Sequence, residues 1–196
     1  MGKMKIKKSE FLKDPFHVAK NLLGATLHSN IGGKPTSGRI VELELYTGRG
    51  DKACHAWRGK TPRNAVMFGP GGFAYVYFVY GMHHMMNVVI SKAGEANAIL
   101  IRALEPIDGL ETMKARRKIR DEKNLCNGPA KLTQALGITR KHNGEDLEGA
   151  VIWLEASPKK FPAASGKRIG VDYAGKDAAL PWRFVIKGNK FISKPI

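Results

Sequence analysis

The residues best suited to chemistry lie in one alternating segment, from Gly38 to Tyr46 (GRIVELELY). Alternation of this kind predicts a β-strand, because successive strand side chains point to opposite faces. The apolar face carries Val41, Leu43 and Leu45, and the other face carries Glu42, Glu44 and Tyr46. A carboxylate two residues from an aromatic ring suits a general base that activates water beside a stacked planar substrate. A solvated strand glutamate is the alternative, and this segment alone leaves both interpretations open.

A second strand, predicted over residues 74–80, is rich in tyrosine. Tyr75 and Tyr77 share a face, and Tyr80 falls at the strand end, just before Gly81. Aromatic strand residues usually belong to a core. Tyrosines are harder to bury than phenylalanines because each hydroxyl needs a partner, so stacking on nucleic-acid bases stays open beside burial.

The sequence offers little for a metal or a phosphate-binding loop. His83 and His84 are adjacent, so on a strand they point to opposite faces, and no third ligand is near. The glycines of residues 69–72 form a turn without the P-loop lysine, and no nucleophile-elbow pattern is present. We therefore expect no metal site and no cofactor.

The remaining elements must position these residues. Asp14-Pro15 predicts the start of a helix that ends at Gly24, and Asn127-Gly128-Pro129 predicts another with Lys131 in its first turn. Residues 47–72 predict a long loop, which in a compact domain is usually functional or disordered. A basic helix is predicted over residues 107–123, either as a solvated face or as a binding surface. Further strands are predicted over residues 87–91, 98–104, 151–154, 168–171 and 183–186.

Composition indicates one folded domain with an affinity for polyanions. The chain has 196 residues, is 43% hydrophobic and carries a formal net charge of +16, which makes nucleic acid the first candidate partner. The two cysteines, Cys54 and Cys126, are too few and too far apart to hold such a domain together by disulfide bonds. We therefore expect a reducing compartment and buried thiols. The basic start of the chain lacks the apolar run of a signal peptide, and residues 73–90 are too polar for a membrane helix.

Seven ordered motifs resemble the alkyladenine (3-methyladenine) DNA glycosylase family of the mixed α/β type. They read RIVELELY, CHAWRGKTPRN, MFGPGGFAYVYFVYGMHHMMNVV, LIRALEP, NLCNGPAKLTQALGI, RIGVDYAG and LPWRFVIKG. Their order and approximate spacing agree across nearly the whole chain. The resemblance implies an α+β fold, a single compact domain over residues 1–196. A curved antiparallel or mixed β-sheet would be surrounded by helices, with a β-hairpin that inserts into DNA.

The resemblance also implies roles for individual residues. Glu44 matches the general base, Arg102 matches an arginine that helps to hold the attacking water, and the backbone carbonyl of Ile169 matches a third contact to that water. The base pocket would comprise Tyr46, His55, Tyr77 and Asn87, with Asn87 rejecting the 2-amino group of guanine. Tyr80 would enter the duplex where the base has left, supported by Met82 and His83. Thr61, Arg63 and Lys131 fall in motifs that resemble phosphate-contacting segments.

The implied activity is base excision. The enzyme would flip an alkylated purine out of duplex DNA and hydrolyse its N-glycosidic bond without a lyase step, leaving an abasic site. Damaged double-stranded DNA is the expected partner, with no membrane association. A monomer in the bacterial cytoplasm, associated with the nucleoid, is expected. Two alternatives remain: a nucleic-acid binding module without catalysis, and a relative that acts on free nucleosides or RNA.

Overall fold

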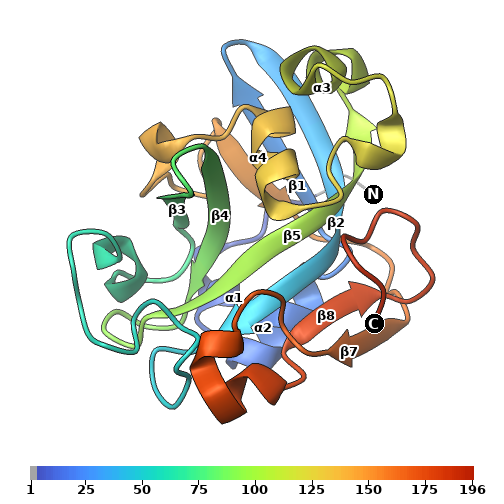
Figure 1. The fold of residues 1–196 in the computed structure, drawn as a ribbon. Helices are drawn as coiled ribbons and strands as arrows, with labels where there is room; N and C mark the ends of the chain where they lie inside the picture. The colour runs from blue at the N-terminus through green and yellow to red at the C-terminus, as the bar shows by residue number, and fades with distance from the viewer. Residues whose placement is uncertain (1–3) are drawn as a thin grey trace.

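The long strand β2 (Lys34–Tyr46) organises a curled antiparallel sheet (Figure 1). The structure, a computed structural model, describes residues 4–196, so residues 1–3 of the predicted domain lie outside it. Along one edge β2 pairs with β1 (Thr26–Ile31) and then with β8 (Arg183–Ile186), and along the other with β5 (Asn97–Asp108). The outer strands are β6 (Ile152–Glu155) beside β1, β7 (Ala163–Gly166) beside β8, β4 (His83–Ile90) beside β5, and β3 (Ala74–Val79) beside β4.

Short helices flank this sheet. The α-helices are α1 (Lys8–Phe11), α2 (Pro15–Leu22), α3 (Leu110–Arg117) and α4 (Pro129–Leu136). The 3-10 helices are η1 (Ala65–Phe68), η2 (Glu122–Asn124), η3 (Arg140–His142) and η4 (Asp172–Ala179). Helix α2 begins where its sequence predicts, because the Asp14 carboxylate accepts from the backbone N–H groups of Phe16 and His17.

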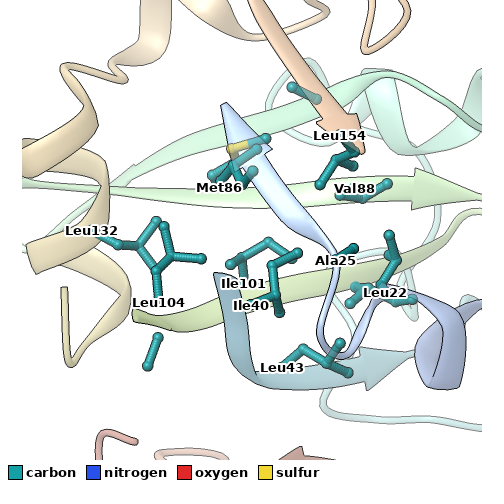
Figure 2. Close-up of a cluster of buried hydrophobic side chains, with 14 of the residues drawn as sticks. Leu22, Ala25, Ile40, Leu43, Met86, Val88, Ile101, Leu104, Leu132 and Leu154 are labelled. Atoms are coloured by element: carbon teal, nitrogen blue, oxygen red, sulfur yellow. The ribbon is translucent and has the colours of Figure 1, made fainter. Parts of the chain in front are cut away.

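One face of the sheet holds the main hydrophobic core. Figure 2 shows side chains from β2, β4 and β5 packed with Leu154 of β6, with Leu132 of α4 at one end of the cluster and Leu22 of α2 at the other. Leu22, Ile40, Ile101 and Leu132 are at most 1% exposed. Truncating such a leucine to alanine typically costs about 2–5 kcal/mol, so this layer fixes how the strands associate.

The alternating residues of the same strands point to the opposite face. There β2 and β5 are out of register around Glu42, so that Val41 and Arg102 have no Cα partner across the pair. Irregularities of this kind bend a strand and re-aim its side chains, and they are common beside active sites. Arg102 projects from the face that carries Glu42 and Glu44 and contacts both carboxyl groups.

The predicted α+β class and curved antiparallel sheet are confirmed, and so are most of the strands. The strand predicted over residues 168–171 is wrong: Gly170 has a left-handed φ of 74° there, and the strand that pairs with β8 is β7. The helix predicted over residues 107–123 spans only 110–117, because Lys118 turns left-handed with φ 54°. Both cysteines are buried and free. Between residues 4 and 196, no helix is long and apolar enough to cross a membrane.

Candidate active site

A cavity of about 340 Å³ opens on the face opposite the core, close to the C-terminal end of β2. Strands β2, β3, β4 and β5, the loop 47–72 and the segment 169–173 all contribute to its wall. Its lining includes Tyr46, His55, Arg63, Tyr75, Tyr77, Tyr80, Asn87, Leu100, Arg102, Pro129, Ile169 and Tyr173. Segments far apart in the sequence thus bring most of the predicted site residues to one place.

Glu44 lies fully buried directly behind this wall. Its Oε2 accepts from the Tyr46 hydroxyl at 2.7 Å and from Arg102 at 3.3 Å, and its Oε1 accepts from the backbone N–H of Ile169 at 2.8 Å. Burial raises the pKa of Glu44 above its ordinary value, although Arg102 and the two other hydrogen bonds oppose this. A carboxylate has about four acceptor positions, so three donors leave one on Oε1 for a water molecule.

The guanidinium of Arg102 joins two buried carboxylates. Its Nε donates to Glu42 Oε1 at 3.1 Å, while another nitrogen faces Glu44. Glu42 is fully buried and also accepts from Arg183 at 3.1 Å. Burial lowers the pKa of Arg102, but the charges of Glu44 and Glu42 outweigh this effect and raise it. The site therefore places two buried carboxyl groups against two guanidinium groups.

Two aromatic rings of the cavity have a guanidinium group over one face. The Arg168 guanidinium lies 4.7 Å from the centroid of the Tyr46 ring, and that of Arg63 lies 5.3 Å from the centroid of Tyr77. Burial and the charge of Arg63 lower the pKa of His55 to about 4, so its ring is neutral at physiological pH even though solvent reaches it from the cavity.

The proposed base slot is narrow between two of its rings. The centroids of His55 and Tyr77 are 4.6 Å apart with an interplanar angle of 74°, an edge-to-face contact. A base stacked between two rings needs about 7 Å, twice the 3.4 Å spacing of a base stack. A purine that enters between them must therefore displace His55, whose Nδ1 is hydrogen-bonded to the hydroxyl of Tyr75 at 3.1 Å.

Asn87 stands on β4 beside these rings. Its side-chain Nδ2 donates to the backbone carbonyl of Tyr75 at 3.1 Å, and the residue is 5% exposed. This bond to the neighbouring strand holds the amide in one orientation at the cavity wall. Asn87 is therefore a fixed steric feature of the pocket.

The β3–β4 hairpin presents three exposed residues next to the cavity. Tyr80 is 84% exposed and Met82 is 69% exposed, and His83 follows at the start of β4. Tyr80 has a left-handed φ of 54°, which is rare for a bulky residue and costs free energy. The hairpin itself is as predicted, and its insertion into DNA stays a prediction.

The predicted phosphate-contacting residues are less closely grouped. Arg63 lines the cavity, and Thr61 is exposed two residues before it. Lys131 lies in the first turn of α4, where its Nζ donates to Asn127 at 2.8 Å, and Pro129 of the same turn reaches the cavity. Of the three residues, Arg63 alone lines the cavity.

Two structural features involve residues that had no predicted role, although Asn64 and Arg168 lie inside the matching motifs. Asp51 and Arg168, both fully buried, form a bidentate ion pair at 2.6 and 2.8 Å that supports the rear of the Tyr46 ring. Buried Asn64 donates to the backbone carbonyls of His55 and Gly59, which fixes the loop that carries His55. A single polar residue in a loop gives no periodic signal, so only the folded chain reveals these contacts. Within residues 4–196 no group of three His, Cys, Asp or Glu side chains could hold a metal ion.

Comparison with known proteins identifies the family of this chain. The profile of the family described as methylpurine-DNA glycosylase (MPG) matches residues 9–190. A protein of Chlorobaculum tepidum is 49% identical over 180 residues, covering 90% of this chain and 85% of its own. One from Rhodopseudomonas palustris is 49% identical, covering 97% and 92%, and one from Alkaliphilus oremlandii is 44% identical, covering 97% and 100%. All three are provisionally named 3-methyladenine DNA glycosylases. The chain therefore belongs to the methylpurine-DNA glycosylase family.

Proposed function

We propose that this protein is a monofunctional DNA glycosylase of base-excision repair, which removes an alkylated purine of the 3-methyladenine type from duplex DNA. The observation that carries the proposal is the buried Glu44, held by Tyr46, Arg102 and Ile169 at the wall of an aromatic cavity. Family membership and the names of the bacterial relatives support the same activity.

In the proposed reaction Glu44 takes a proton from a water molecule that attacks the sugar C1′. The carboxylate also stabilises the positive charge that develops on the sugar as the bond to the base breaks. Arg102 helps to hold the water, and the carbonyl of Ile169 supplies a further contact. The product is an abasic site. No lysine lines the cavity within the described part of the chain, which supports hydrolysis without a lyase step.

The flipped base is proposed to stack among Tyr46, Tyr77 and His55. Each base–aromatic contact is worth roughly 1–3 kcal/mol, and a cationic alkylpurine gains from the electron-rich ring faces. The backbone N–H of His55 would bind the edge of the base. Asn87 would exclude guanine by its bulk against the 2-amino group, consistent with its fixed orientation.

Extrusion of the base is assigned to the hairpin. Tyr80 would fill the gap in the duplex, with Met82 and His83 beside it on the minor-groove side, because a flipped base leaves a cavity that an inserted side chain can occupy. Thr61, Arg63 and Lys131 would contact phosphates and fix the register of the protein on DNA. One lesion needs one such site, so we expect a monomer that works on DNA in the bacterial cytoplasm, without a cofactor.

Glu44→Gln tests the assignment. Because the amide cannot accept the proton, we expect release of 3-methyladenine from methylated duplex DNA to slow by at least about 10²-fold, with binding of lesion DNA retained. Release is measured under single-turnover conditions and binding by fluorescence anisotropy. Glu95→Gln, at an exposed position, is the matched control. Undiminished release by Glu44→Gln would refute the role of Glu44, and binding without any release by the wild type would favour a module without catalysis.

A free-nucleoside or RNA-acting enzyme is distinguished by its substrates. Methylated duplex DNA, methylated RNA and free 3-methyladenosine are compared at equal concentration. The cavity, the exposed hairpin and the net charge of +16 favour duplex DNA. A faster reaction with methylated RNA or with free 3-methyladenosine would instead favour an enzyme that acts on RNA or on nucleosides.

A further inference from the structure

Glu42 is a buried carboxylate that the proposed chemistry does not use. It is fully buried on the same strand face as Glu44, about 7 Å further along the strand. Its Oε1 accepts from Arg102, Arg183 and the Ser193 hydroxyl, and its Oε2 accepts from the Ser193 backbone N–H. A charge is costly to bury, so four donors around one carboxylate indicate a position that the fold maintains closely.

These contacts fix the orientation of Arg102. Its Nε is bound to Glu42 at 3.1 Å and one terminal nitrogen lies 3.4 Å from the Ser193 hydroxyl oxygen. A guanidinium is planar and rigid, so holding two of its nitrogens sets the direction of the third. That third nitrogen is the one that donates to Glu44, at 3.3 Å.

Arg183 holds the two residues that follow Ser193. The Arg183 guanidinium donates to the carbonyls of Lys194 and Pro195, each at 2.9 Å, and to Glu42. Its Nε donates to the carbonyl of Lys167 at 2.9 Å, two residues before Ile169. The segment after β8 therefore returns to β2, as Figure 1 shows, where Ser193 contacts Glu42.

The charge of Glu42 also acts on Glu44. Without Glu42, the positive charge of Arg102 would face Glu44 alone and would favour its ionised form more strongly. A more strongly stabilised carboxylate is a weaker base. Glu42 divides the attraction of Arg102 between two carboxylates and leaves Glu44 better able to take a proton.

We propose that Glu42, locked by Ser193 and Arg183, is a positioning residue that aims Arg102 at Glu44 and keeps Glu44 basic. The inference rests on the proposed role of Glu44 as the general base. It assigns a role in the rate of base release to residues 193–195, which do not themselves line the cavity.

Glu42→Gln removes the charge while nearly conserving the shape. In single-turnover release of 3-methyladenine across pH, we expect the plateau rate to fall by about 10-fold. We also expect the acidic midpoint to move down by roughly one pH unit, because the pKa of Glu44 falls when the negative neighbour is lost. Glu42→Asp keeps the charge and should restore the midpoint. A purely structural role would lower the rate and leave the midpoint in place, which would overturn the proposal.

Ser193→Ala supplies a milder variant in case Glu42→Gln fails to fold. It removes one donor to Glu42 and the contact with Arg102, and we expect a roughly 3- to 10-fold lower plateau with an unchanged affinity for lesion DNA. Lys194→Ala is the matched control, because only the backbone of Lys194 contacts Arg183. Equal rates for these two variants would also overturn the proposal. If the wild type releases no base, or Glu44→Gln releases it normally, then the proposed function fails instead.

Discussion

The surroundings of Glu44 have opposing effects on the pKa of its carboxyl group. Burial raises the pKa of Glu44, while Arg102, the Tyr46 hydroxyl and the Ile169 N–H lower it. A general base works best when its pKa approaches the working pH, so the raised value favours catalysis. The donors also restrain the carboxylate, which leaves the residue oriented and still basic.

Tyr46→Phe tests this balance. The variant removes a donor that lowers the pKa of Glu44, so the pKa rises further and the acidic midpoint of base release moves to higher pH, by roughly half to one unit. This direction is opposite to the one expected for Glu42→Gln. Single-turnover rates measured across pH for both variants give the comparison. A midpoint that stays in place would show that another group controls the acidic limb.

At the residue scale the sequence predicts the residues at the centre of the site, but not the residues that hold them in place. The alternation of residues 38–46 places Glu44 and Tyr46 on one face because strand geometry follows directly from spacing. The pairing of Asp51 with Arg168 joins positions 117 residues apart, and no local pattern encodes it. Glu42 shares the predicted face, but only its surroundings in the fold separate it from a solvated glutamate.

At the scale of elements the β3–β4 hairpin is strained where it is most exposed. Tyr80 adopts a left-handed φ of 54° although 84% of its surface is open to solvent, so packing in this structure does not account for a bulky residue there. Strain of this kind often marks a functional position. A role in entering the duplex would explain why an aromatic residue occupies a turn position that suits glycine.

Tyr80→Gly separates strain from function. Glycine adopts this φ without steric cost, so we expect the free energy of unfolding to stay level or to rise by up to about 1 kcal/mol, as measured by urea denaturation. Release of 3-methyladenine from duplex DNA should fall by at least about 10-fold. Tyr80→Phe keeps the ring and should remain close to the wild type. A Tyr80→Gly variant with full activity on duplex DNA would argue against the wedge.

Element boundaries are predicted where local signals are strong. Asp14 and Pro15 start α2 as expected, because capping is a local interaction. Strand β1 is absent from the prediction because its sequence, TLHSNI, does not alternate clearly between apolar and polar residues. The strand predicted over residues 168–171 fails at Gly170. The segment that pairs with β8 is determined by the folded sheet, and composition does not predict it.

At the scale of the whole molecule the charge of +16 should dominate binding to undamaged DNA. Contacts with phosphates release counterions, so we expect affinity for undamaged duplex to fall by roughly 10³-fold between about 50 and 200 mM salt. Fluorescence anisotropy over that range measures the slope. Base release from a preformed lesion complex should depend on salt far less, because it takes place in the cavity. A shallow slope would mean that much of the positive charge lies away from the DNA.

The contact between Ser193 and Glu42 spans 151 positions of the chain. During synthesis the strands that carry Glu44 and Arg102 emerge long before Arg183 and Ser193. A nascent chain that lacks residues 183–193 therefore cannot complete the carboxylate–guanidinium cluster around Glu42. The proposed site becomes complete only when these residues have been synthesised and have folded onto β2.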